Sequence, residues 1–571
     1  MPEPSERAAP AQVRGLPADE EPSDGRPAPG SSLEAFSPAA RDWFTGAFST
    51  PTAAQEGAWK AIAGGEHALV VAPTGSGKTL AAFLWAIDRL ISQAAVPQPA
   101  GPRSGSATPG APAASAASAE ASAEAAAAND RSGSDLRRKA SSASSKRRAT
   151  TRVLYISPLK ALGVDVERNL RSPLIGITQT ARRMGLEPPE ISTGVRSGDT
   201  PQAVRRALLA SPPDILITTP ESLYLMLTSK ARESLRGVET VILDEVHAVA
   251  GTKRGAHLAV SLERLDDLLE RPAQRIGLSA TVDPVETVTR FLGGSQPVAV
   301  VRPESTKRWD LEISVPIPDM TVLGGPAASG SLLESDYDAE EPANVASIWP
   351  HVEERVVDLV EAHRSTIVFA NSRGLAEKLT ARLNEIHAFR LEHAPEADDP
   401  AESTAGEATQ PSGIERQHNR YEGAAPLLAR AHHGSVSKDQ RALIEEDLKS
   451  GVLRCVVATS SLELGIDMGL VDLVVQIESP PSAASGLQRV GRAGHQVGEI
   501  SIGRMFPKHR GDLLDAAVTV EQMLAGRVEP LHIPSNPLDI LAQQTIAVCA
   551  TETVPVEDWW DTVRRAAPFL G

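Results

Sequence analysis

Short apolar runs alternate with longer segments of helical periodicity along most of this chain. In the first half, each β-rich run is followed by a stretch with helical spacing of its apolar residues; these runs are His67–Val71, Val153–Ile156, Ile215–Thr218, Thr240–Leu243 and 275–278. Such alternation is typical of a parallel sheet covered by helices on both faces. The pattern predicts a first α/β domain over residues 31–310, preceded by a Pro- and Ala-rich tail at 1–30 that we expect to be disordered.

A second α/β domain is predicted over residues 346–530, joined to the first by a Gly-, Ala- and acid-rich linker at 311–345. Its expected strands are Thr366–Phe369, 454–458 and Leu473–Ile477. Polar segments at 92–150 and 391–424 interrupt the two domains and are interpreted as disordered insertions, because the elements that flank them are strong. The first carries basic clusters at 137–139 and 146–148. We favour a charged spacer there over a tether for nucleic acid.

Residues 531–571 begin a third unit, with an apolar helix at Leu538–Cys549 and a second helix around 559–567. So short a unit can hardly bury a core of its own. The two cysteines, Cys455 and Cys549, both lie in apolar stretches and are expected to be buried thiols without a metal or redox role.

Charge and targeting signals narrow the classes of function. The formal net charge of -16 argues against a protein that coats nucleic acid, but it leaves a motor open, because only the field of the binding groove matters there. The 571 residues contain no signal peptide and no apolar run long enough to span a bilayer. A cytoplasmic location without a membrane partner is therefore expected.

The segment 72–79 (A-P-T-G-S-G-K-T) follows the apolar strand that ends at Val71 and opens a helix. Small residues in a strand–turn–helix context allow backbone amides to surround phosphate oxygens, as in the P-loop of ATP-binding proteins. Lys78 would place a cation on the β- and γ-phosphates, and the Thr79 hydroxyl would bind Mg²⁺. The predicted nucleotide-binding residues of this loop are Thr74, Gly75, Ser76, Gly77, Lys78 and Thr79.

The apolar strand at Thr240–Leu243 runs directly into two acids, Asp244 and Glu245. An apolar strand that ends in two acids, in a domain that also has a P-loop, is the Walker B arrangement. Asp244 should hold Mg²⁺, and Glu245 should orient and deprotonate the attacking water. An acidic pair at a strand end is by itself more often a turn or a helix cap. Together with the P-loop it indicates an ATP hydrolase, while kinases, transporters and GTPases remain open.

The other strand ends carry phrases that resemble the motifs of superfamily 2 helicases, in the order in which that superfamily has them. These are 48–55 (F-S-T-P-T-A-A-Q), 157–162 (S-P-L-K-A-L), 218–223 (T-T-P-E-S-L), 279–281 (S-A-T), 369–373 (F-A-N-S-R), 458–467 (A-T-S-S-L-E-L-G-I-D) and 488–495 (Q-R-V-G-R-A-G-H). The resemblance implies two tandem RecA-like domains with ATP in the cleft between them. Each phrase is weak alone, but all of them in this order are highly specific.

The resemblance also assigns roles to single residues. The Gln55 amide would pair with the adenine edge. Asp467 would complete the nucleotide site from the second domain, and Gln488 would take part in catalysis with Lys78, Glu245 and Arg492. Arg492 would reach the γ-phosphate as an arginine finger. Single-stranded nucleic acid would be gripped by Lys160, Thr219, Arg373 and Thr459. The motif at 488–495 ends in His495, at a position where many relatives have a further arginine.

The family can be narrowed further. The phrases at 157–160, 461–467 and 488–495 resemble the large helicase-related (Lhr) family, and 533–544 is similar to that family's entry into a winged-helix domain. This implies an ATP-dependent DNA helicase that translocates 3′ to 5′, with a role in DNA repair. An RNA or RNA–DNA hybrid helicase is the close alternative. The family's core is longer than this chain, so a truncated ATPase that is stimulated by nucleic acid but does not unwind is a further alternative.

Overall fold

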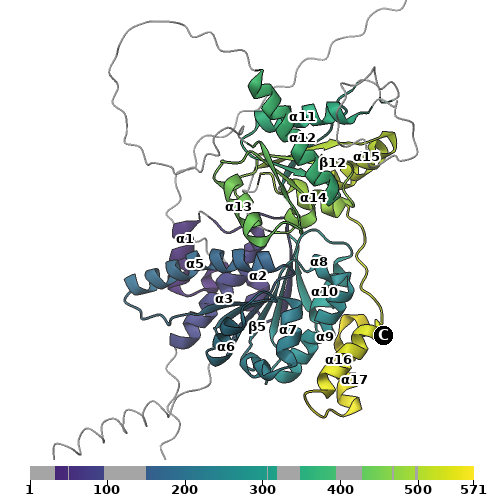
Figure 1. The fold of residues 1–571 in the computed structure, drawn as a ribbon. Helices are drawn as coiled ribbons and strands as arrows, with labels where there is room; N and C mark the ends of the chain where they lie inside the picture. The colour runs from purple at the N-terminus through teal and green to yellow at the C-terminus, as the bar shows by residue number, and fades with distance from the viewer. Residues whose placement is uncertain are drawn as a thin grey trace, which may run out of the picture.

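The computed structural model describes residues 32–48, 50–95, 150–304, 307–317, 320, 347–393, 427–465, 468–494 and 499–570. Two α/β domains lie one above the other, and the C-terminal helices return along the side of the first domain (Figure 1). The tail expected at 1–30 lies outside the described residues, as do most of the linker, most of both insertions, Asp467 and His495.

The first domain is built on a seven-stranded parallel sheet in the order β3-β4-β2-β5-β6-β1-β7. Its strands are β1 (His67–Val71), β2 (Val153–Ile156), β3 (Thr193–Arg196), β4 (Ile215–Thr218), β5 (Thr240–Leu243), β6 (Gln274–Ser279) and β7 (Val298–Val301). The inner strands are apolar and buried because helices cover both faces of the sheet. The strands expected from apolar runs are all present.

Helices on the two faces enclose separate apolar cores. One face carries η1 (Ser32–Ala35), α1 (Pro38–Ala47), α2 (Ala53–Ala63), α3 (Lys78–Ala95) and α5 (Lys160–Arg183). The other carries α7 (Pro220–Leu227), η2 (Lys230–Leu235), α8 (His247–Ala250), α9 (Lys253–Leu268) and α10 (Val285–Gly293), while α6 (Gln202–Ala210) lies beyond β3 and has no buried residue. Since every strand is parallel, the loops that precede the helices gather at the carboxyl edge of the sheet, where ligands bind in such folds.

The second domain has a six-stranded parallel sheet in the order β10-β11-β9-β12-β13-β8. Its strands are β8 (Arg308–Ile313), β9 (Thr366–Phe369), β10 (Ala429–His432), β11 (Cys455–Ala458), β12 (Leu473–Ile477) and β13 (Ile500–Phe506). Its helices are α11 (Trp349–Ala362), α12 (Arg373–Glu392), α13 (Lys438–Lys449), η3 (Ser460–Leu462), α14 (Ala483–Val490) and α15 (Arg510–Leu524). The prediction of two tandem parallel-sheet domains is confirmed.

The strand β8 corrects one expected boundary. It spans residues 310 and 311, where the first domain was expected to give way to a linker, yet it pairs with β13 in the second sheet. Its side chains alternate between exposed and half-buried, as at the edge of a sheet. Because β8 lacks a continuous apolar run, its pattern did not reveal it as a strand.

The C-terminal unit packs against the first domain. Its helices α16 (Leu538–Cys549) and α17 (Val556–Arg565) and the turn η4 (Ala567–Phe569) lie beside α9 (Figure 1). Val563, Ala566 and Phe569 join the same apolar core as α9, which is how so short a unit buries its apolar side. Cys455 is buried as expected, but Cys549, the last residue of α16, is exposed, which corrects the prediction for that thiol.

Candidate active site

The P-loop lies between β1 and α3. Gly75 and Gly77 have φ angles of 83° and 77°, a left-handed backbone that favours glycine. The Lys78 side chain is buried, and its Nζ donates to the Ala72 carbonyl oxygen at 3.1 Å across the loop. Among the described residues, the buried Ser76 hydroxyl has no hydrogen-bond partner. A loop that holds a buried lysine and an unpaired hydroxyl matches the predicted binding of phosphate groups at this position.

Gln55 lies against this loop, but its amide is engaged by the chain itself. Its Oε1 accepts from the Thr52 amide at 2.9 Å and caps α2, while its Nε2 donates to the Gly77 carbonyl at 3.4 Å. A Cβ at Gly77 would approach this Nε2 to 2.5 Å, so that position has no room for a side chain. Gln55 therefore joins α2 to the P-loop, and its pairing with adenine stays a prediction.

Asp244 and Glu245 follow β5 directly and are both buried. Glu245 has a φ of 45°, which turns the chain sharply, and its amide donates to Asp244 Oδ1 at 2.9 Å. The Tyr155 hydroxyl of β2 donates to Asp244 Oδ2. Burial and the neighbouring Glu245 raise the pKa of Asp244 to about 7, although Tyr155 and Lys78 act in the opposite direction.

The pKa of Glu245 moves the other way. Burial alone would raise it, but the charges of Lys78, His247 and Arg492 outweigh burial and hold the pKa below its usual value. The Glu245 carboxylate is thus ionised at neutral pH, as a general base must be. Two adjacent carboxyl groups with opposite pKa shifts are a common sign of divided roles in a catalytic site.

The metal predicted here would be held by oxygen atoms of Thr79, in the first turn of α3, and of Asp244. A carboxylate and a hydroxyl beside a phosphate cradle match the hard oxygen ligands that Mg²⁺ requires. When bound, Mg²⁺ neutralises charge on the phosphates. The raised pKa of Asp244 fits this use, because a buried carboxylate without a fully compensating cation favours its protonated form.

His247 connects the first domain to the second. Its Nδ1 lies 3.2 Å from the Ser279 hydroxyl and accepts from the Ala280 amide at 3.3 Å. Its Nε2 lies 2.8 Å from the amide of Gln488 in α14. The imidazole thus joins the Walker B segment, the loop after β6 and the second domain, a role that its place in the sequence did not reveal.

Two arginines of the second domain, Arg489 and Arg492, lie near the cleft, and they differ in their bonding partners. Arg489 is buried and bonded to Asn371, Gln476 and Glu463, which fixes it as a structural group of the second domain. Arg492 is buried beside Glu245 and lowers the pKa of that carboxyl. Of the two arginines, Arg492 is the one whose charge acts on Glu245, and its role as an arginine finger stays a prediction.

Other contacts hold the cleft together. The Thr74 hydroxyl donates to the Gly491 carbonyl at 3.4 Å, and a Cβ at Gly465 would lie 3.2 Å from Glu245 Oε1. Lys307, between β7 and β8, also donates to the Gly491 carbonyl, at 3.1 Å. Burial together with Arg492 and Lys78 lowers the pKa of Lys307 to about 8. No motif marks Lys307, since it approaches the cleft only when the two sheets are assembled.

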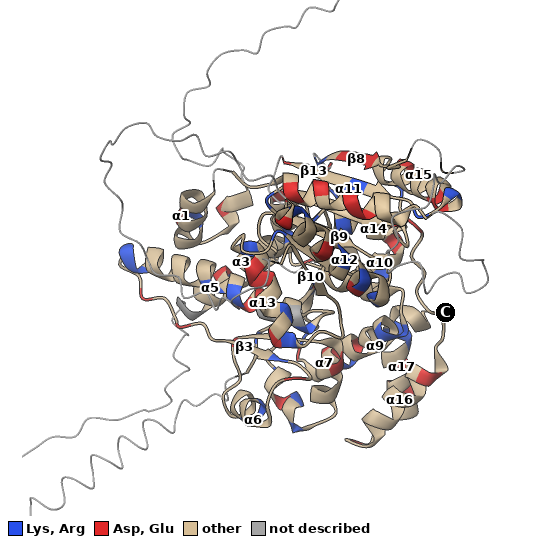
Figure 2. Ribbon diagram, turned by 45° about the horizontal axis from the view of Figure 1, so that its top comes forward, with Lys and Arg blue, Asp and Glu red and all other residues tan. Residues whose placement is uncertain are grey.

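The residues predicted to bind nucleic acid differ in their exposure to solvent and in their bonding partners. Lys160 is exposed and its Nζ is paired with Asp199 at 2.6 Å; Lys438 of the second domain also acts on Asp199, so the domains approach each other here. Arg373 is exposed and bonded to Ser435 at 2.9 Å, and Thr459 is half-buried. Basic and acidic residues are interspersed along the ribbon of both domains (Figure 2).

Thr219 caps a helix, and its contact with nucleic acid stays a prediction. It is only 4% exposed, and its hydroxyl accepts from the Ser222 amide at 3.4 Å as the N-cap of α7. The structure therefore gives no support to a phosphate contact by that hydroxyl. No helix in the described part of the chain has both the length and the apolar character needed to cross a membrane.

Family models match three consecutive parts of the chain. Residues 52–289 match the DEAD/DEAH box helicase family, residues 415–496 the helicase conserved C-terminal domain, and residues 521–571 the winged helix domain of the large helicase-related protein. These are the two parallel-sheet domains and the unit that packs on α9. The fold, the cleft and these matches define a superfamily 2 helicase.

Comparison with individual proteins places the chain within that class. It is 57% identical over 537 residues to a Lhr helicase/probable uracil glycosylase of Mycolicibacterium smegmatis, covering 94% of this chain and 31% of that protein. It is 54% identical to the Lhr helicase/uracil glycosylase of Escherichia coli over 95% of this chain and 32% of that protein. The chain belongs to the Lhr family of helicases. It spans about a third of the length of these two relatives.

A solved structure agrees with this placement. The structure of Mycobacterium smegmatis helicase Lhr bound to ssDNA and AMP-PNP matches with a TM-score of 0.73 and 55% identity, covering 95% of this chain and 56% of that one. The winged-helix match also agrees with the third unit expected from 533–544.

Proposed function

We propose that this chain is an ATP-driven motor that moves along single-stranded DNA, 3′ to 5′, and separates duplexes in its path, with a role in DNA repair. Its relatives are much longer, so this proposal concerns the helicase core that the chain contains. A cytoplasmic location is part of the same proposal.

One observation carries the proposal: Glu245, Lys78 and Arg492 converge across the cleft between the two sheets. A general base and a phosphate-binding lysine come from the first domain, and a cation that can neutralise the transferred phosphoryl group comes from the second. Catalysis of phosphoryl transfer consists largely of such positioning and charge stabilisation. Because the second domain supplies one of the groups, hydrolysis depends on how closely the domains approach each other.

Movement would follow from that dependence. ATP bound at the P-loop would hold the domains together through Arg492, and loss of the γ-phosphate would release them. The Gln488–His247 contact at 2.8 Å would transmit the change to the loop after β6. A strand held by Lys160 in one domain and by Arg373 and Thr459 in the other would then be shifted with each cycle. Grip through phosphates should be weakened by salt and largely independent of sequence.

DNA is favoured over RNA because the closely similar Lhr structure was solved with ssDNA. RNA or an RNA–DNA hybrid remains the second candidate, since the same motifs serve both polymers and only a 2′-hydroxyl contact would separate them. A third candidate is an ATPase that is stimulated by nucleic acid but does not unwind.

Unwinding by the full chain tests the proposal. Duplex DNA with a 3′ single-stranded tail should be separated in the presence of ATP, and the same duplex with a 5′ tail should not. Preference for a tail of RNA would favour the second candidate. ATP hydrolysis without strand separation on any substrate would favour the third.

A further inference from the structure

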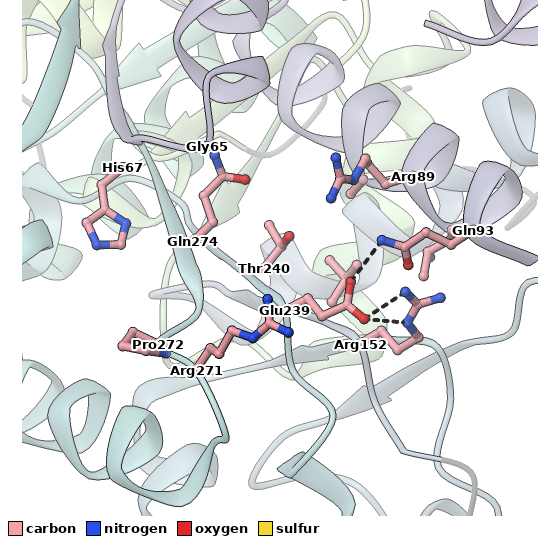
Figure 3. A pocket seen from close by; sticks show the side chains of 13 residues that line it. Gly65, His67, Arg89, Gln93, Arg152, Glu239, Thr240, Arg271, Pro272 and Gln274 are labelled. Carbon is pink, nitrogen blue, oxygen red and sulfur yellow. Dashed lines mark hydrogen bonds and ion pairs between the residues drawn. The ribbon is translucent and has the colours of Figure 1, made fainter. Parts of the chain in front are cut away.

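A second polar hollow lies in the first domain, at the opposite edge of its sheet from the ATP cleft. It has a volume of about 370 Å³ and is formed where β1, β2, β5 and β6 begin, together with one side of α3 (Figure 3). The ATP cleft lies at the carboxyl ends of the same strands. The P-loop and the residues predicted to grip nucleic acid take no part in lining this hollow.

Three guanidinium groups line this hollow, and they come from three separate elements: Arg89 from α3, Arg152 from the approach to β2, and Arg271 from the loop before β6. The hollow contains a single carboxylate, Glu239 (Figure 3). Arg152 Nη2 pairs with Glu239 Oε1 at 2.7 Å, and Gln93 Nε2 donates to Oε2 at 3.3 Å. Glu239 is therefore already engaged.

Arg89 and Arg271 have no ion pair among the described residues; Arg89 lies over the ring of Trp85 at 5.8 Å. Two guanidinium groups without an ion pair among the described residues thus line one hollow of a chain whose net charge is -16, although the charge of Arg89 also acts on the neighbouring Asp88. Guanidinium groups present paired N–H donors in a plane, a geometry that matches the oxygens of phosphate and carboxylate groups.

His67 adds a donor to the same hollow. The Arg275 amide donates to its Nδ1 at 2.9 Å, so in the neutral ring the proton lies on Nε2. Burial and the nearby Arg275 lower the pKa of His67, which keeps the ring neutral at physiological pH. The Gln274 amide nitrogen is occupied by the carbonyls of Ile62 and Glu66, so it serves to shape the wall.

We propose that this hollow, lined by Arg89, Arg152, Arg271 and His67, is an anion site that binds a diphosphate group. The volume lies at the lower end of the range for small-ligand pockets, which suits a diphosphate better than a whole nucleotide. Such a group can come from free pyrophosphate or from the phosphorylated 5′ end of a nucleic acid. Since the site lies apart from the ATP cleft, it is independent of the proposed motor activity.

Calorimetric titration of the full chain with pyrophosphate tests this proposal. The titration uses the Lys78→Ala background, so that the P-loop contributes little to binding. The double variant Arg89→Ala/Arg271→Ala should bind pyrophosphate at least about tenfold more weakly, because two charge-assisted contacts are lost. The control Arg182→Ala/Arg290→Ala removes two exposed arginines that lie outside the hollow and should leave binding unchanged.

Equal affinity in the Arg89→Ala/Arg271→Ala variant, or an equal loss in the control, would overturn the proposal. A second arm compares single-stranded DNA with and without a 5′ phosphate. A preference for the phosphorylated strand that disappears in the double variant identifies a nucleic-acid end as the source, whereas binding of pyrophosphate alone identifies a free anion. When Lys78 is left unchanged, the Arg89→Ala/Arg271→Ala variant should hydrolyse ATP at the normal rate, which separates this result from any failure of the motor.

Discussion

At the scale of single residues, the divided pKa shifts of Asp244 and Glu245 define the chemistry of the cleft. The two carboxyl groups are adjacent in the chain, yet the first has its pKa raised and the second has it lowered. The difference arises from their partners: Glu245 lies among Lys78, His247 and Arg492, whereas Asp244 faces the Tyr155 hydroxyl and the charge of Glu245 itself.

Substitution of the base and of the P-loop lysine should separate binding from hydrolysis. Lys78→Ala should abolish ATP turnover, because the buried cation of the phosphate cradle is lost. Glu245→Gln should retain ATP binding and lose hydrolysis by orders of magnitude, about 10² or more, because the amide cannot accept a proton from water. Steady-state turnover together with nucleotide-binding titrations would measure both. Lys60→Ala, an exposed lysine of α2, serves as the control. Near-normal turnover in Glu245→Gln would refute the assignment of the base.

Lys307 should give the cleft a measurable pH signature. Its pKa of about 8 in the free protein means that it is half-charged at that pH, and the lowering is caused by burial, Arg492 and Lys78. Bound triphosphate would favour the charged form, so nucleotide binding at pH 8 should take up about half a proton. Calorimetry in buffers with different ionisation enthalpies measures this uptake.

The variant Lys307→Gln isolates the contribution of that lysine from those of other groups. It should lose the uptake at pH 8, and its loss of nucleotide affinity should be smaller at pH 9 than at pH 7, because fewer of the native lysines are charged in the free protein at the higher pH. The same proton uptake in Lys307→Gln and in the unchanged chain would show that Lys307 does not sense the nucleotide.

At the scale of elements, the sequence predicted those parts whose signal is local. Thr74–Thr79, Asp244 and Glu245 were predicted because each follows a strand of continuous apolar residues. Contacts between distant segments have no such local signal. The strand β8 has the alternating pattern of an edge strand, and Lys307 contacts Gly491 only across the cleft. Tyr155 lies in an apolar strand, so its sequence position indicates only a buried core residue. The motif also did not indicate that the Thr219 hydroxyl caps α7.

One buried amide, that of Gln544, helps to attach α16 to α9. Gln544 has no exposed surface; its Oε1 accepts from Arg264 at 2.7 Å, and its Nε2 donates to Ser261 Oγ at 3.0 Å. Gln544→Ala would leave these buried groups without partners and should lower the free energy of unfolding by about 1–3 kcal/mol. Thermal unfolding would measure the loss. The adjacent, exposed Gln543→Ala should change stability little, and equal effects of the two variants would contradict this attachment.

At the scale of the whole molecule, the two sheets act as one site only while the domains touch. The Gln488–His247 contact crosses the cleft at 2.8 Å, and His247 also contacts the loop after β6. Gln488→Ala should therefore keep ATP binding but lose much of the stimulation by single-stranded DNA, about tenfold. His247→Ala should have a similar effect. The double variant should be no worse than either alone if the two residues act through one contact; losses that multiply would indicate independent roles.

The central claim is that the chain couples ATP hydrolysis in the cleft to single-stranded DNA, and hydrolysis rates test it most directly. Turnover by the full chain would be measured without nucleic acid, with single-stranded DNA, and with single-stranded RNA of equal length, at one low salt concentration. Strong stimulation by DNA, weak stimulation by RNA, and loss of both rates in Glu245→Gln are the predicted result. Turnover that nucleic acid does not change, or that RNA stimulates as strongly as DNA, would contradict the account.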